Sequence, residues 1–208
     1  SDLVLSNHGF ATAAEIAAPV IGRQTQLDQG FAEYRDTLSA GVKLKVIALV
    51  GKNDPVASID SSNVLHLEER MAAGITDRGI EFIRAHTTDK SFLWLHYFDP
   101  HTSYAPPMEF RNRFPANSYL AEVNYVDSEI GRLLDTLRGL GLDANTLVVL
   151  TADHGEGRHQ HGEASHAFFV YDTTLRVPLV MWGTPIIRRG SLVNSLVRTA
   201  DIAPTILD

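Results

Sequence analysis

The 208-residue chain contains no cysteine. This absence excludes disulfide bonds, thiolate metal sites and a cysteine nucleophile, and it leaves the redox compartment undetermined. Lysine is scarce, and none follows Lys90. The sequence has 18 basic and 25 acidic residues, and its formal net charge of -7 argues against a nucleic-acid surface, which needs clustered Lys and Arg.

The sequence also lacks long hydrophobic runs. No stretch approaches the roughly 20 apolar residues that span a bilayer, and the first residues do not show the charged and apolar regions of a signal peptide. We therefore expect no membrane segment in this chain. Internal repeats, low-complexity segments and linkers are absent too, so residues 1–208 are expected to form a single domain.

The pattern of apolar residues predicts a layered α/β fold. Residues 1–40 show weak periodicity and are expected to be loop-rich, whereas residues 41–208 carry the sheet-and-helix core. Apolar runs predict strands at residues 42–50, 91–98, 146–153 and 177–182. Helical spacing predicts amphipathic helices at residues 68–86 and 120–137. Strands that alternate with long helices favour a largely parallel sheet, which binds ligands at the carboxyl ends of its strands.

Six of the nine histidines follow or end two of these predicted strands. They are His96, His101, His154, His159, His161 and His166. The topology of a parallel sheet can bring them to one edge. This convergence is the strongest functional signal that the residues themselves provide.

Asp153 and His154 are adjacent at a strand-to-loop turn, where two side chains can bind one ion. A carboxylate and an imidazole suit Mn²⁺ or Zn²⁺ well, and suit Ca²⁺ if other oxygen ligands join them. Gly155 is expected to supply backbone freedom beside them. The alternative is an ordinary turn with a hydrogen-bonded aspartate.

The remaining histidines differ in what their surroundings suggest. His101 follows Pro100 and can donate a proton to a leaving group, or it is simply a loop histidine. His166 can reach an anionic substrate or a metal, because glycines let its loop fold back. For His96, within an apolar strand, a hydrogen-bonded core residue is favoured, and for His159 and His161 solvent exposure is favoured.

Five segments resemble the sulfatase family of the alkaline-phosphatase-like superfamily, in order and spacing. They are "FLWLHYFDPHTSYAPP", "YLAEVNYVDSEIGRLLDTL", "VVLTADHGEGRHQHGEASH", "YDTTLRVPLVMWG" and "LVRTADIAPTILD". The resemblance covers residues 80–208, with a weaker continuation at residues 27–34. It implies an alkaline-phosphatase-like α/β/α sandwich with a largely parallel central sheet, truncated at both ends.

The resemblance also implies an activity and a site. The activity is hydrolysis of sulfate esters, which are small anionic substrates, at a bound divalent cation, commonly Ca²⁺. Asp153 and His154 would be metal ligands, and His101 would contact the sulfate or protonate the leaving oxygen. His166 resembles a histidine that lies near the metal and the transferred group in related phosphoethanolamine transferases. Many family members act outside the cytoplasm, in the periplasm or the extracellular space.

The chain departs from the family pattern in three ways. It has no Cys/Ser-x-Pro-x-Arg motif, from which sulfatases make formylglycine, and no acidic ligand pair near its amino terminus. A lysine that sulfatases often place after the Asp-His-Gly turn is missing as well, and His166 or Arg158 can replace its charge. These departures predict that the 208 residues are the later part of a sulfatase-type domain and are inactive by themselves.

Two other functions stay open. The missing lysine and the presence of His166 are also compatible with a phosphodiesterase, a phosphonate hydrolase or a phosphoethanolamine transferase of the same superfamily. A non-catalytic pseudoenzyme could use Asp153, His154 and His101 to bind a metal or an anion.

Overall fold

The structure, a computed structural model, describes residues 2–36, 70–101, 104–162, 166 and 169–207. The chain divides into an amino-terminal unit, Asp2–Glu129, and a carboxy-terminal unit, Ile130–Asp208. The boundary falls within helix α4 (Ser118–Gly139). The strand that the sequence predicts at residues 42–50 lies outside the described residues.

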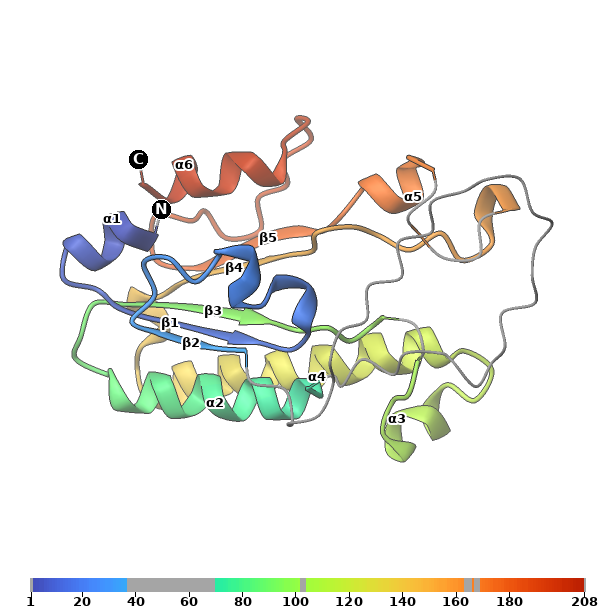
Figure 1. Cartoon of the computed structure of the whole chain (residues 1–208), viewed down its shortest axis with the longest axis horizontal. Helices are drawn as coiled ribbons and strands as arrows, with labels where there is room; N and C mark the ends of the chain where they lie inside the picture. Colours follow the sequence, from blue (N-terminus) through green and yellow to red (C-terminus); the bar gives the residue numbers. More distant parts are fainter. Residues whose placement is uncertain (1, 37–69, 102–103, 163–165, 167–168, 208) are drawn as a thin grey trace. The chain divides into compact units, whose positions relative to one another are not determined.

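The amino-terminal unit contains a three-stranded sheet in which every pair is parallel (Figure 1). The strands are β1 (Ala11–Ile16), β2 (Glu33–Arg35) and β3 (Ser91–His96), in the order β2-β1-β3. Strand β1 pairs with β3 over its whole length, and Ile16 lies opposite His96. The predicted parallel sheet and the predicted strand at residues 91–98 are thus confirmed.

The expectation of loop-rich structure over residues 1–40 is wrong for the centre of this sheet. Strand β1 is the central strand, and a short helix, α1 (Asp2–Asn7), precedes it. Alanine is a weak strand former, so the sequence of β1 carries little strand signal. Successive residues of β1 are buried, which shows that both faces of the strand are covered and that small side chains fit there.

Helix α2 (Ala72–Ala85) runs along one face of the sheet and packs against β1 and β3 (Figure 1). It confirms the helix predicted at residues 68–86. Ile75 and Phe82 of this helix are buried, whereas Met71 precedes the helix and is 49% exposed.

Two side chains from later in the sequence accept hydrogen bonds from the first backbone groups of α2. The Ala72 N–H donates to Asp99 Oδ2 at 2.9 Å, and the Ala73 N–H donates to the Tyr125 hydroxyl at 2.8 Å. The first N–H groups of a helix have no partner within the helix, so these contacts satisfy them. Burial raises the pKa of the Asp99 carboxyl above its usual range, and the hydrogen bond from Ala72 opposes this effect.

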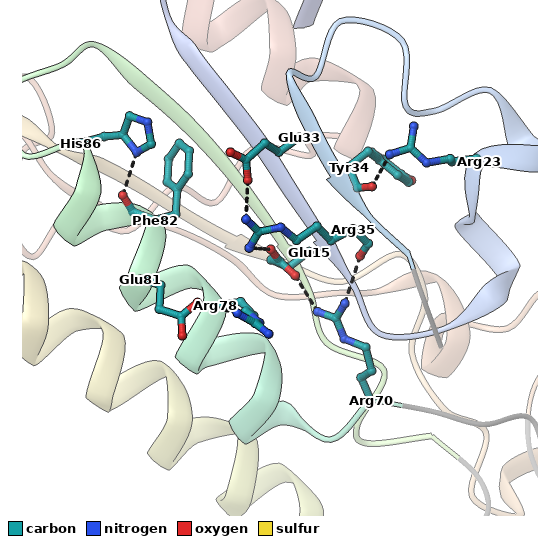
Figure 2. Close-up of polar contacts among 10 residues, drawn as sticks. All are labelled: Glu15, Arg23, Glu33, Tyr34, Arg35, Arg70, Arg78, Glu81, Phe82 and His86. Carbon is teal, nitrogen blue, oxygen red and sulfur yellow. Dashed lines mark hydrogen bonds and ion pairs between the residues drawn. The ribbon is translucent and has the colours of Figure 1, made fainter. Parts of the chain in front are cut away.

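A buried carboxylate joins three segments of the amino-terminal unit (Figure 2). The Glu15 side chain, on β1, is 2% exposed and lies 3.0 Å from Arg35 Nη1 and 2.6 Å from Arg70 Nη2. Arg70 also donates to the Arg35 carbonyl oxygen at 3.0 Å. A buried charge needs partners of opposite sign. Glu15 has two, because Arg35 precedes the segment at residues 37–69 in the sequence and Arg70 follows it.

The carboxy-terminal unit contains the antiparallel pair β4 (Leu147–Thr151) and β5 (Leu179–Gly183). These strands confirm the predictions at residues 146–153 and 177–182, and their antiparallel pairing is a feature that periodicity does not specify.

Helix α4 confirms the helix predicted at residues 120–137. The described part of the chain also contains three short α-helices, which are α3 (Met108–Arg113), α5 (Asp172–Leu175) and α6 (Ile202–Leu207). Within the described part of the chain, no helix is both long and apolar enough to cross a membrane.

We predict that Arg70→Ala destabilises the protein by up to about 3 kcal/mol, because it leaves the buried Glu15 carboxylate with one half-exposed partner. The free energy of unfolding in urea measures this effect. Arg78→Ala is the control: it breaks the exposed pair with Glu81, acts on Glu15 only through a longer-range charge without direct contact, and should change stability little. Equal effects of the two substitutions would contradict this role of Glu15.

We also predict that Asp99→Asn changes how stability depends on pH. Because the pKa of Asp99 is raised in the folded state, the carboxyl contributes to folding stability when it is protonated. This contribution is fully present below the unfolded-state pKa of about 3.9 and is lost as the pH rises through the folded-state pKa. The amide oxygen introduced by the substitution can still accept the Ala72 N–H, but the amide does not ionise. Relative to the unsubstituted protein, the variant should therefore gain stability between acidic and neutral pH, as measured by urea unfolding at a series of pH values. A pH-independent difference would refute this prediction.

Candidate functional site

Asp153 and His154 follow the carboxyl end of β4 and form a turn with internal hydrogen bonds. The His154 N–H donates to Asp153 Oδ1 at 2.9 Å. His154 Nδ1 lies 2.8 Å from the Gly155 carbonyl oxygen, which can only accept. The hydrogen of the neutral ring is therefore on Nδ1, and the lone pair is on Nε2.

This arrangement fits a shared metal ion. His154 Nε2 and Asp153 Oδ2 are 3.9 Å apart, and two atoms that each bind one ion at about 2.0–2.6 Å lie no more than about 5 Å apart. The bond from Nδ1 to a carbonyl oxygen is the outer contact that metal-binding histidines usually make. Both side chains are accessible, at 83% exposed for Asp153 and 41% for His154.

These two residues alone would not complete a metal centre. Zinc sites usually have four ligands and calcium sites have six to eight. No group of three or more His, Cys, Asp or Glu side chains that could hold a metal gathers among the described residues. The turn offers one nitrogen and one carboxylate, so a metal bound here would need further ligands.

Gly155 has a different role from the one expected. A Cβ atom at this position would overlap the Thr173 carbonyl oxygen. The Gly155 N–H also donates to the Thr174 carbonyl oxygen at 2.8 Å. The residue is thus required for the close approach of two backbone segments, which fixes the turn against α5, and not for backbone freedom.

Glu156 and His166 form a second polar contact in the same loop. Glu156 Oε1 lies 3.3 Å from His166 Nδ1 and accepts the Gly157 N–H at 3.1 Å. The Glu156 side chain is only 6% exposed. The rings of His166 and His154 are also in contact, with centroids 4.1 Å apart. The structure therefore places His166 beside the proposed metal-binding turn.

No role for Glu156 follows from the sequence alone. The glutamate lies within a run of glycines, histidines and other charged residues, and this composition suggests a solvated loop. Nothing in the sequence distinguishes its buried carboxylate from the exposed one of Asp153. The one available signal was its position directly after the Asp-His-Gly turn.

The tip of the loop has an unusual backbone. Arg158, His159 and His161 have φ angles of 46°, 65° and 57°, in the left-handed region that few non-glycine residues adopt. His159 and His161 are exposed, as predicted. The ring of His161 nevertheless stacks on Tyr171, with centroids 4.3 Å apart.

His96 and His101 belong to the amino-terminal unit. His96 is half-buried at the end of β3, and its Nδ1 lies 3.4 Å from the Ala17 N–H, in line with a structural role. The ring of His101 stacks on Phe98, with centroids 4.2 Å apart. The bond from Ala72 to Asp99 anchors the segment that leads from β3 to His101.

The structure thus brings together three of the four predicted site residues, namely Asp153, His154 and His166, within the carboxy-terminal unit. His101 lies in the amino-terminal unit. The convergence of all six histidines at one edge stays a prediction.

Comparison with known proteins gives consistent results. The sulfatase family model matches residues 4–208. The N-acetylglucosamine-6-O-sulfatase of Bacteroides thetaiotaomicron is 39% identical over 90 residues, which are 43% of this chain and 16% of that protein. Human iduronate 2-sulfatase is 36% identical over 80 residues, which are 38% of this chain and 14% of that protein.

A solved structure shows the same fold. It is a protein in complex with its substrate D-glucosamine-2-N,6-O-disulfate, and it aligns with a TM-score of 0.68 and 19% identity over 99% of this chain and 59% of its own. The chain therefore spans less than two thirds of that protein, and the segments that match the two sulfatases are shorter still. On the match of the family model over nearly all of its residues, the chain belongs to the sulfatase family, with the alkaline-phosphatase-like fold.

Proposed function

We propose that this chain contributes part of the active site of a metal-dependent hydrolase of sulfate esters. The observation that carries the proposal is the Asp153–His154 turn, in which a carboxylate oxygen and an unprotonated imidazole nitrogen lie 3.9 Å apart in a chain of the sulfatase family. Phosphodiester, phosphonate and phosphoethanolamine chemistry is the alternative within the superfamily.

Four residues have proposed roles. Asp153 and His154 hold a divalent cation, for which Ca²⁺ is the first candidate by family, with Mn²⁺ and Zn²⁺ as alternatives on the chemistry of the donors. When bound, such an ion neutralises negative charge on the oxygens of the ester. His166 lies beside this turn and contacts the anion, and His101 protonates the leaving oxygen.

The proposal does not extend to the nucleophile. Sulfatases use formylglycine, and no residue of this chain stands in the motif from which it is made. We also expect the 208-residue chain alone to show little turnover, because groups that act as a unit do not contribute independently.

The names of the relatives support a proposal for the substrate class. Two of them are named for sulfated sugars or sugar acids, and a third was solved with a disulfated glucosamine as its substrate. We propose a sulfate monoester of a saccharide, a small anionic ester, as the substrate class.

The proposed function predicts that the native protein containing this chain hydrolyses p-nitrophenyl sulfate faster than bis-p-nitrophenyl phosphate. Removal of metal with EDTA should abolish the hydrolysis, and Ca²⁺ or Mn²⁺ should restore it. Faster cleavage of the phosphodiester would favour the alternative chemistry. Binding of metal without turnover of either ester would favour a pseudoenzyme.

We further predict that Asp153→Asn lowers metal affinity at least tenfold, because the substitution removes the charged ligand of the turn. Loss of an outer contact alone typically lowers metal affinity by about tenfold to a hundredfold. Isothermal titration with Ca²⁺ and Mn²⁺ measures the affinity. The matched control is Asp89→Asn, which neutralises an exposed carboxylate in the other unit. Unchanged affinity in the Asp153 variant would refute the ligand assignment.

A further inference from the structure

Glu156 is a buried carboxylate whose position needs an explanation. Its side chain is 6% exposed, and burial of a carboxylate is costly unless hydrogen bonds or charges compensate. One compensating group is the Gly157 N–H, which donates to Oε1 at 3.1 Å. A second is the ring of His166, whose Nδ1 lies 3.3 Å from the same oxygen.

This contact constrains the ring of His166. An ionised carboxylate can only accept a hydrogen bond, so the hydrogen of the neutral ring must be on Nδ1. Nε2 is then the nitrogen with the lone pair. Unconstrained neutral imidazole can exchange between the two tautomers, and a carboxylate at Nδ1 selects one of them.

A second contact of His166, with the ring of His154, restricts the orientation of the His166 ring. The rings of His166 and His154 have centroids 4.1 Å apart and an interplanar angle of 33°. His154 is itself fixed by the bond between its Nδ1 and the Gly155 carbonyl oxygen. Each histidine of this pair therefore has an acceptor at Nδ1, which leaves the ring lone pair on Nε2.

We propose that Glu156 is a positioning residue, which holds His166 in the Nδ1–H tautomer and directs Nε2 to the substrate. The consequence for catalysis rests on the role proposed above for His166. The tautomer itself does not depend on that role. Catalytic histidines are held in one tautomer and orientation by a carboxylate in the same way when they must present a single nitrogen.

The direct test is ¹⁵N NMR of the histidine side chains in the metal-free chain, at a pH above the titration of the imidazoles. His166→Gln identifies the signals of His166 by their loss. We expect His166 to show a protonated Nδ1 and an unprotonated Nε2. A protonated Nε2 would overturn the proposal, and this result needs no variant of Glu156.

Two substitutions at Glu156 separate its role from simple packing. Glu156→Leu has a similar volume but no acceptor, and should release His166 to a mixture dominated by the Nε2–H form. Glu156→Gln is the matched control, because its amide oxygen can still accept from Nδ1, and it should keep most of the Nδ1–H form. An unchanged tautomer in the leucine variant would overturn the proposal.

Turnover of p-nitrophenyl sulfate by the native protein tests the catalytic consequence. Glu156→Leu should lower kcat by about tenfold to a hundredfold with little change in KM, and Glu156→Gln should recover most of the loss. An unchanged kcat in the leucine variant would refute the positioning role. Absence of turnover in the unsubstituted protein would instead refute the proposed function, while the NMR result would still decide the tautomer.

Discussion

The backbone of Gly155 lies against the Thr173–Thr174 segment so closely that no side chain fits between them, and its N–H donates to the Thr174 carbonyl oxygen. This contact fixes the turn that follows β4 to helix α5. Because Asp153 and His154 directly precede Gly155, their positions depend on it.

Two carboxylates of this loop, Asp153 and Glu156, have opposite environments and suit different roles. Asp153 is 83% exposed and can bind an ion that arrives from solvent, whereas Glu156 is 6% exposed and faces a histidine of the same loop. A buried carboxylate is effective at orienting its partner because a hydrogen bond is stronger away from water. The loop thus combines an accessible pair of proposed ligands with a proposed internal support for His166.

The sequence predicted those parts of the fold whose side chains show a helical period or a continuous apolar run. Helices α2 and α4 show the first pattern, and strand β3 shows the second. Strand β1 shows neither pattern, because its alanines give no strand signal. Its place at the centre of the sheet is evident only from the structure, in which both of its faces are covered. At the site, residue type predicted the neighbours Asp153, His154 and His166. The sequence could not reveal the burial of Glu156 or the close contact at Gly155, because both depend on segments brought together by folding.

A crystal structure of the native protein with Mn²⁺ and sulfate would show whether Asp153 and His154 hold the metal of a sulfate ester hydrolase. We expect anomalous scattering from an ion within about 2.0–2.6 Å of an Asp153 carboxylate oxygen and of His154 Nε2, with the sulfate against His166. An ion bound elsewhere, with this turn free of metal in the presence of the anion, would contradict it.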